Sequence, residues 1–479
     1  MPNYNAPGIY IQDEIGGSQT IDQQSSSIGC LFGQTRSGTP NVLQKVTSWT
    51  EFIEKFANGL ATPFMANSYL PYAVYGFFQN GGNYLYVCNI KKNAVKAKIT
   101  TTGSKITFTA SSEGTWANGL RVRFKKSGNY TDTNKRFDVI FTLGNNSVTL
   151  RSVKLENLVE SVMASPRLRA WIGSVTLASD SALAEETATL AGGADGDTLT
   201  DTEYLSALNL LDTVDDVTMV GIPGQTSNNI NNGLISYCET NNLFPIIDMP
   251  MGATIEDTYE YRESISAFTG ALAYPWGKVN DPLTNTLIAV PTVGHVMGVY
   301  ARTIETRGVF KVPAGLEASV NGFVEMETAL TISQVDILNP VGVICIVSRP
   351  NAGIVIWGAR SLNSTDKTMR YVSDGLLNLN IKKSLYTGTQ FAIFEPNNAD
   401  LWSRLETACT SFLEDLRNQG ALRGEPEEAY YVTVNSTNNT ETSIENGELN
   451  IEVGYAPVKP AEFIVIKLSH SITVNNSAD

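Results

Sequence analysis

The chain has 479 residues, more than one hydrophobic core usually organises, so we expect several structural units. Its formal net charge is -14 and no stripe of Lys or Arg could neutralise phosphates, which argues against nucleic-acid binding. No apolar run approaches the roughly 20 residues that span a bilayer, so we also expect no direct membrane insertion. Only 17% of the residues are charged, which suggests that much of the surface is buried against partners.

Residues 1–27 are predicted to form an extended N-terminal arm. A short β-branched run, Ile9-Tyr10-Ile11, follows Pro7-Gly8 and precedes a polar tract with Gly16-Gly17 and Ser25 to Ser27. Such a segment cannot bury enough apolar area to fold alone, but it can add a strand to a neighbouring sheet. The glycines and serines predict flexibility. The N-terminus lacks a basic region followed by an apolar core, so we expect the protein to be made in the cytoplasm.

An α/β core domain is predicted over residues 28–95 and 198–345. Strand-like runs alternate with helix-length segments, which is typical of a parallel sheet covered by helices. The expected strands are residues 28–32, 84–88, 216–223, 243–248 and 272–274. The expected helices are residues 49–56, capped by Ser48, then 69–78 and 262–268.

Residues 96–197 are predicted to form a β-rich domain inserted into this core. Period-two alternation at 105–109, 120–124 and 137–142 is broken by Gly and Asn turns. The end of the insert, residues 190–197, is interpreted as a polar hinge. Asp195, Asp197 and Asp201 suggest calcium only superficially, because the EF-hand spacing and its closing Glu are missing.

Residues 346–479 are predicted to form an α+β C-terminal domain. An Asn397-Asn398 cap precedes a helix with apolar residues spaced three and four apart, which ends at Gly420. Its polar side is either a solvated surface or a partner surface. Three strands are expected at 430–434, 448–453 and 462–468, with Pro457 and Pro460 leaving strand edges unpaired.

Enzyme motifs are missing from the sequence. The chain has only two histidines, His295 and His470, and its five cysteines are expected to be reduced core thiols. Asp248, at the end of a predicted strand, lies where an α/β enzyme could keep a catalytic carboxylate. We predict no enzyme activity, no metal and no cofactor, and an α/β enzyme with an unrecognised active site remains the alternative.

Four motifs near the C-terminus follow one another at spacings that resemble a known family. They are Trp357-Gly358-Ala359-Arg360, Phe394-Glu395-Pro396-Asn397-Asn398, Gly420-Ala421-Leu422-Arg423-Gly424 and Ala456-Pro457-Val458-Lys459-Pro460-Ala461-Glu462-Phe463-Ile464. Glu113 to Leu120 is similar to the family's insertion-domain signature. Together these motifs resemble the contractile tail sheath proteins of phage tails, tailocins and extracellular contractile injection systems.

The resemblance implies a structural subunit that polymerises helically around an inner tube protein and contracts to drive the tube through a target envelope. It implies baseplate and terminator or cap proteins as further partners, and a place in a phage tail or a released injection particle after assembly in the bacterial cytoplasm. Strands exchanged between subunits would come from the arm residues Pro7, Gly8, Ile9, Tyr10 and Ile11 and from the C-terminal strand residues Glu462, Phe463, Ile464, Val465, Ile466 and Lys467. The side chains expected to face the tube are Arg404, Glu414, Arg417 and Arg423.

Overall fold

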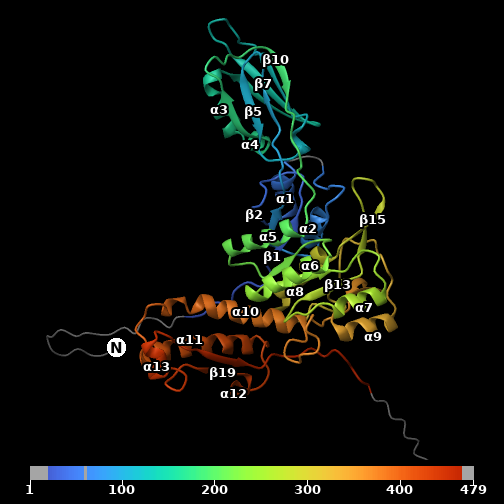
Figure 1. The fold of residues 1–479 in the computed structure, drawn as a ribbon, viewed down its shortest axis with the longest axis vertical. Helices are drawn as coiled ribbons and strands as arrows, with labels where there is room; N and C mark the ends of the chain where they lie inside the picture. Colours follow the sequence, from blue (N-terminus) through green and yellow to red (C-terminus); the bar gives the residue numbers. More distant parts are fainter. Residues whose placement is uncertain (1–19, 59–61, 467–479) are drawn as a thin grey trace, which may run out of the picture.

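The computed structural model describes residues 20–58 and 62–466, and its fold is mixed α/β with several sheets (Figure 1). The largest sheet has eight strands. In spatial order they are β18 (Gly353–Ile356), β17 (Val343–Arg349), β13 (Ala271–Tyr274), β12 (Phe244–Asp248), β11 (Met219–Gly221), β1 (Gly29–Gly33), β3 (Leu85–Asn89) and β2 (Leu43–Val46). The six inner strands run parallel and the two edge strands run antiparallel to them. The predicted parallel sheet is therefore confirmed.

Helices cover both faces of this sheet, because alternate residues of each strand point to opposite sides. In β1, Leu31 belongs to one core, whereas Cys30 and Phe32 belong to the other. The first core also contains residues of α2 (Leu70–Gln79), α8 (Val293–Arg307) and α10 (Val372–Gly388). The second contains residues of α5 (Asp201–Leu208), α6 (Asn228–Thr240) and α9 (Ile332–Leu338).

One further helix and a small sheet complete the core. Helix α1 (Trp49–Phe56) is capped by Ser48 as predicted, since the Ser48 hydroxyl accepts a hydrogen bond from Glu51 N. Strands β15 (Leu287–Val290), β14 (Gly277–Asn280) and β16 (Glu325–Met326) form an antiparallel side sheet. Within the described ranges, no helix is long and apolar enough to cross a bilayer.

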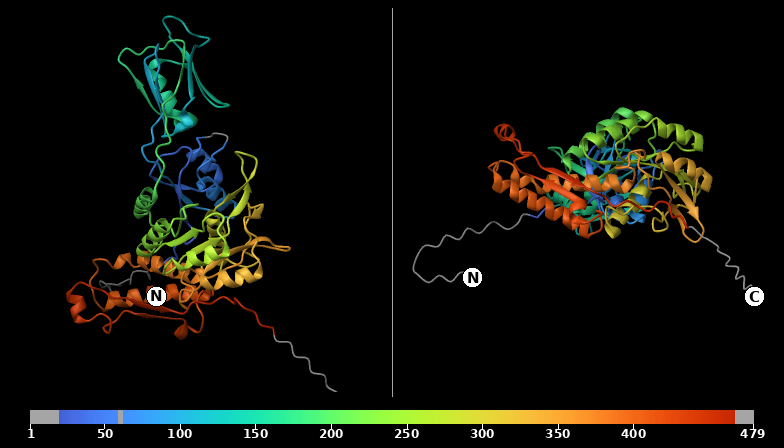
Figure 2. Two further views of the ribbon diagram at one scale, coloured as in Figure 1. Left: turned by 45° about the vertical axis from the view of Figure 1, so that its right-hand side comes forward. Right: turned by 90° about the horizontal axis from the view of Figure 1, so that it is seen from below.

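The insert has a hydrophobic core of its own and stands at one end of the molecule (Figures 1 and 2). One of its two sheets contains β4 (Lys98–Thr100), β5 (Ile106–Ala110) and β9 (Ile172–Leu177). The other contains β10 (Glu186–Thr189), β6 (Arg121–Lys126), β7 (Phe137–Leu143) and β8 (Asn146–Val153). Helices α3 (Leu155–Ala164) and α4 (Pro166–Trp171) pack on them and were not predicted.

The C-terminal elements form a layer at the opposite end, below α10 (Figure 1). Helix α11 (Ala399–Asn418) begins at its predicted cap, Asn398, and buries its predicted apolar side. The layer also contains α12 (Pro426–Ala429), β19 (Tyr430–Thr433), α13 (Glu441–Glu445) and β20 (Glu452–Tyr455). Buried residues of α11 join the same core as α10 and the large sheet, so the C-terminal layer is packed firmly on the core.

Three predicted boundaries were wrong. Strand β17 crosses the expected domain boundary at 345/346, because β17 and β18 pair as the hairpin that ends the core sheet. The helix expected at 262–268 is α7 (Ile255–Glu263), because Thr254 and Asp257 cap each other's backbone and start the helix earlier. The strand expected at 448–453 begins later, at Glu452.

One prediction about the chain ends needs correction. Residues 21–27 are not a free arm: Ile21, Ser26 and Ser27 are buried, so the flexibility expected for the serine stretch is wrong. Residues 462–466 pair with no described strand in the single chain, so a C-terminal strand formed with a neighbouring subunit stays a prediction. Lys467 lies outside the described residues.

Candidate assembly surface

Helix α10 holds the C-terminal layer and the start of the chain against the core. Its first ten residues are all buried, and Gly375 lets the helix approach the turn before β13, since a Cβ there would lie 2.0 Å from Thr269 Oγ1. On another side, Asn380 Nδ2 donates to Gln24 O at 2.6 Å and to Ser26 Oγ at 2.8 Å. Gln24 N donates to Ser384 Oγ. The chain therefore leaves toward its N-terminus from a fixed point near the end of α10.

A cluster of polar and charged side chains holds the C-terminal segment at the other end of α10. The Arg360 guanidinium makes two hydrogen bonds to the Glu462 carboxylate, from Nε and from Nη2, each at 3.0 Å. Asn339 Nδ2 and the Tyr371 hydroxyl also donate to Glu462, at 2.7 and 2.9 Å. We call these four residues the Glu462 clamp. It brings the motif at 357–360 into contact with the motif at 456–464, about a hundred positions further along the chain.

The electrostatics of the clamp favour a charged Glu462. Burial raises the pKa of Glu462, but the hydrogen bonds from Arg360, Asn339 and Tyr371 outweigh it, so the net pKa is lowered. The side chains of Arg360 and Glu462 are each 14% exposed, so water screens the pair only weakly. Nearby, Lys459 Nζ lies 2.8 Å from Asp374 Oδ2, which gives the segment a second ionic contact.

Beyond the clamp, an exposed apolar run leaves the molecule. Phe463, Ile464, Val465 and Ile466 are each more than 70% exposed. Four consecutive apolar side chains in water are unfavourable for a monomer and typical of a segment that a partner covers. These are four of the six residues predicted for the C-terminal strand.

A small sheet with unpaired edges lies in the same layer. Strands β19 and β20 pair only with each other among the described residues, with Tyr430 opposite Tyr455 and Thr433 opposite Glu452. Helix α11 covers one face. A two-stranded sheet is marginal by itself, and each outer edge presents backbone groups that can pair with another strand.

The side chains expected to face a tube are divided between two environments. Glu414 accepts two hydrogen bonds from Arg417 and one from the Tyr430 hydroxyl, and these contacts lower the pKa of Glu414 to about 2. Arg404 is exposed and stacks over the Phe391 ring at 5.3 Å, and Arg423 is exposed. Arg404 lies on a different turn of α11 from the Glu414–Arg417 pair. The four residues therefore do not form one cluster.

Asp248, considered above as a catalytic carboxylate, and the buried His295 both lie in closely packed surroundings. Asp248, 1% exposed, accepts hydrogen bonds from the backbone N–H groups of Gly224, Thr292 and Val293, the last at the start of α8. Burial raises the pKa of Asp248 to about 7, against the effect of these donors. His295 stacks on Phe323 at 3.9 Å, and burial lowers its pKa to about 3. His470 and the arm residues Pro7 to Ile11 lie outside the described part of the chain.

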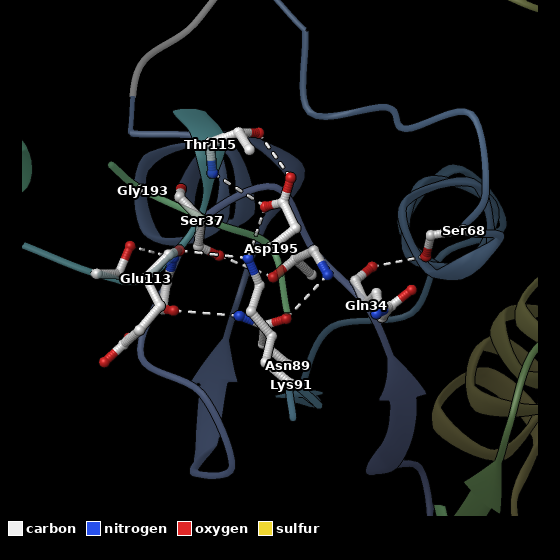
Figure 3. Close-up of polar contacts among 12 residues, drawn as sticks. Gln34, Ser37, Ser68, Asn89, Lys91, Glu113, Thr115, Gly193 and Asp195 are labelled. Carbon is white, nitrogen blue, oxygen red and sulfur yellow. Dashed lines mark hydrogen bonds and ion pairs between the residues drawn. The ribbon is translucent and has the colours of Figure 1, made fainter. Parts of the chain in front are cut away.

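The joint between core and insert is polar, as predicted, but it is paired rather than loose (Figure 3). Lys91 Nζ, almost fully buried, donates to Asp195 Oδ1 at 3.2 Å and to Glu113 O at 3.3 Å. The Thr115 hydroxyl and backbone N–H also donate to Asp195. Val95 and Ala194 exchange two backbone hydrogen bonds, each of 3.0 Å. Two hydrogen-bonded strands therefore connect the insert to the core.

The three carboxylates near this joint point to different partners. Asp195 binds Lys91 and Thr115, whereas Asp197 accepts from Asn93 Nδ2. Asp201 accepts from Ser227 and Asn229 on α6. No group of three or more metal-ligating side chains occurs among residues 20–58 and 62–466.

Sequence reasoning missed the clamp as a site. Arg360 and Glu462 each belong to a quoted motif, but nothing in the sequence paired them. Asp374 accepts a hydrogen bond from the Tyr371 backbone N–H in the first turn of α10, and an acidic residue there is the one sequence signal that could have indicated this helix start.

Two family models match the chain. One, described as "Phage tail sheath protein central domain", matches residues 197–362, and the other, "Phage tail sheath C-terminal domain", matches residues 364–469. Together they account for more than half of the chain.

Two curated relatives are likewise named tail sheath proteins. The tail sheath protein of Escherichia phage P2 is 22% identical over 257 residues, or 52% of this chain and 62% of that protein. The tail sheath protein of Salmonella phage ViI is 23% identical over 174 residues, 36% of this chain and 28% of that protein. The chain thus spans less than two thirds of either relative.

Solved structures of the same fold cover nearly the whole chain. The PVC sheath complex of an extracellular contractile injection system, in the contracted state, has a TM-score of 0.64 at 20% identity and covers 98% of this chain and 99% of that one. The sheath tail protein Lin1278 from Listeria innocua has a TM-score of 0.64 at 13% identity, covering 92% and 96%. With both family models, the named relatives and this shared fold in agreement, the chain belongs to the family of phage tail sheath proteins.

Proposed function

We propose that this chain is the structural subunit of a contractile sheath that polymerises helically around an inner tube and contracts to drive it through a target envelope. The observation that carries the proposal is the C-terminal layer, which holds a two-stranded sheet with unpaired outer edges and continues into an exposed apolar segment. A head-to-tail contact that does not close on itself generates a helical tube. Family membership supports the same assembly.

Strand exchange is the proposed form of cohesion. The segment beyond the Glu462 clamp, residues 463–467, and the arm residues Pro7 to Ile11 add strands to the β19–β20 sheet of neighbouring subunits. Each added backbone hydrogen bond contributes about 1 kcal/mol net, and repetition along the tube makes the lattice cohesive. Because residues 21–27 are fastened to α10, the proposed rotation of subunits does not depend on flexibility in the serine stretch.

Contraction is proposed to be a collective passage from a kinetically trapped extended lattice to a more stable compact one. The energy is stored in the assembled lattice, so the proposal requires no nucleotide. The tube, baseplate and terminator are the proposed partners, with Arg404, Glu414, Arg417 and Arg423 on the side turned to the tube. The proposed location is a phage tail or a released injection particle after cytoplasmic assembly.

Two deletions test strand exchange by negative-stain microscopy of the purified protein with its tube. We expect the full chain to form hollow striated tubes, and chains lacking residues 1–14 or residues 463–479 to remain discrete particles. A chain lacking only residues 470–479 keeps the proposed strand and serves as the control. If the variant without residues 1–14 still assembles full-length sheaths that contract, exchange by the N-terminal arm is wrong.

A further inference from the structure

A fully exposed aromatic side chain follows the C-terminal end of α10. Phe394 is fully solvent-exposed, and its neighbour Ile393 is 57% exposed. The backbone of Phe394 has φ 66, a region that bulky residues rarely occupy and that costs on the order of 1–3 kcal/mol. Hydrogen bonds from Ile393 N to Gln390 O and from Glu395 N to Ala392 O hold the turn. We call Ile393 and Phe394 the apolar knob.

A groove of about 990 Å³ lies at the other end of α10. Tyr371, the residue before α10, lines it together with the C-terminal segment from Val458 to Phe463. Most of the remaining wall is apolar, contributed by Phe310, Val312, Val335, Pro340 and Trp357. The Lys311 side chain also lines the groove. The volume is ample for one aromatic side chain with its neighbour.

The knob cannot reach the groove of its own chain. Helix α10 has 17 residues, so its ends are about 25 Å apart at 1.5 Å per residue. In Figure 1 the α10–α11 connection lies at the left, whereas the C-terminal segment leaves at the right. Complementary surfaces at opposite ends of one subunit favour a head-to-tail contact between copies.

One ion pair is available across the same contact. Glu395 follows the knob directly, and the groove is lined by Lys311 as well as by the acidic Asp336. A carboxylate beside the inserted ring is attracted by the ammonium group and repelled by Asp336, which favours the orientation that places Glu395 beside Lys311.

We propose that the apolar knob of one copy of this chain inserts into the α10 groove of the next copy in the sheath, with Glu395 beside Lys311. The inference rests on the proposed function, because it names a contact within the polymer. A buried aromatic anchor in a pocket is the usual form of an interface hot spot. The energy gained on insertion offsets the strained backbone of Phe394.

Disulfide trapping tests the contact directly. All five native cysteines are buried, so they interfere little with engineered ones. Tubes of the double variant Lys311→Cys/Glu395→Cys, oxidised and run on a non-reducing gel, should give a ladder of covalent oligomers. The single variants should give no species larger than a dimer.

A second measurement does not depend on cysteine geometry. Phe394→Ser should raise the protein concentration needed for tube formation by on the order of tenfold or more. Phe268→Ser, at an aromatic residue that is 45% exposed on another surface, should assemble like the unmodified chain.

The outcomes separate this inference from the proposed function. If the unmodified chain forms no tubes, the proposed function fails. If it forms tubes, but the double variant gives no ladder and Phe394→Ser assembles normally, only the knob contact is overturned. A disulfide in tubes from Lys311→Cys to Ile9→Cys, with none to Glu395→Cys, would assign the groove to the N-terminal segment and also overturn it.

Discussion

At the scale of single residues, the Glu462 carboxylate is the group at the candidate assembly surface that accepts the most hydrogen bonds from side chains. Three side chains donate to it, and they come from three separate stretches of the chain, at Asn339, Arg360 and Tyr371. The clamp therefore fixes where the C-terminal segment leaves the fold. A strand offered to a neighbour needs such a fixed origin, because an ordered end lowers the entropy lost on pairing.

Replacing Glu462 should release that segment. In Glu462→Gln the Arg360 charge stays partly buried without its partner, and since the pair is 14% exposed we expect a cost of about 2 kcal/mol, below the range for fully buried pairs. Protection of the amides of residues 456–462, measured by hydrogen exchange with mass spectrometry, should fall by roughly 30-fold.

The matched control is Glu317→Gln, which breaks the exposed pair with Arg307 and should leave exchange unchanged. Unaltered protection at 456–462 in Glu462→Gln would show that the clamp does not hold the segment.

The clamp should also weaken in acid. The pKa of Glu462 in the folded chain is lowered, so its contribution is complete above the unfolded pKa of about 4.3 and is lost as the pH falls through the folded value. Protection factors at 456–462, corrected for intrinsic exchange, should therefore drop below about pH 4.

Protonation of Asp374 in acid has the opposite effect on stability from protonation of Glu462, because burial raises the pKa of Asp374. The Glu462→Gln variant retains Asp374, so comparing it with the unmodified chain isolates the effect of protonating Glu462. The protection factors of residues 456–462 in this variant should not fall below about pH 4. An equal drop in both proteins would assign the acid effect to another group.

At the scale of elements, α10 is the helix on which the candidate surface depends. Its first ten residues are buried, and it separates the large sheet from α11. Residues 21–27 and the C-terminal segment dock near opposite ends of it. A displacement of α10 would consequently move both chain ends together.

Gly375 packs tightly against Thr269, in the turn that precedes β13. Although Gly→Ala usually stabilises a helix by about 1 kcal/mol, a Cβ at Gly375 would lie 2.0 Å from Thr269 Oγ1, so we expect Gly375→Ala to lower the melting temperature. The Thr269 hydroxyl has no hydrogen-bond partner among the described residues, so removing it costs little. Thr269→Ala should therefore rescue part of the loss in a double-mutant cycle, and simple additivity would refute the clash.

The contrast between α11 and α10 explains what the sequence could predict. Helix α11 has one buried side, so its apolar spacing and its cap at Asn398 located it within a residue or two. Helix α10 is buried nearly all round and carries Asn378, Asn380 and Asp374 inside, so it lacks a periodic apolar stripe. The clamp was equally hidden, because pairing Arg360 with Glu462 depends on tertiary packing, whereas the parallel strands were evident as short apolar runs.

At the scale of the whole molecule, the insert and the candidate assembly surface lie at opposite ends, with the core between them (Figures 1 and 2). The two strands of the joint pair with each other: Lys98 N donates to Ala191 O, and Ala191 N donates to Lys98 O. The insert encloses its own core and closes at a neck. This arrangement separates the insert's folding from the packing that holds the clamp and α10.

Removing the insert should consequently preserve assembly. In a chain where an Asn-Gly turn replaces residues 99–190, Lys98 and Ala191 already face each other, so a two-residue hairpin can close the neck. Lys91 keeps Asp195 but loses the Glu113 carbonyl, and Asp195 loses its two hydrogen bonds from Thr115. The Asn58 carbonyl loses the Trp171 indole, so the melting temperature should fall by several degrees without loss of the fold. Microscopy of the deletion variant should show tubes of smaller outer diameter. As a control for independent folding of the insert, the isolated fragment 95–194 should unfold cooperatively. A soluble, folded deletion variant that forms no tubes would place part of the assembly interface on the insert.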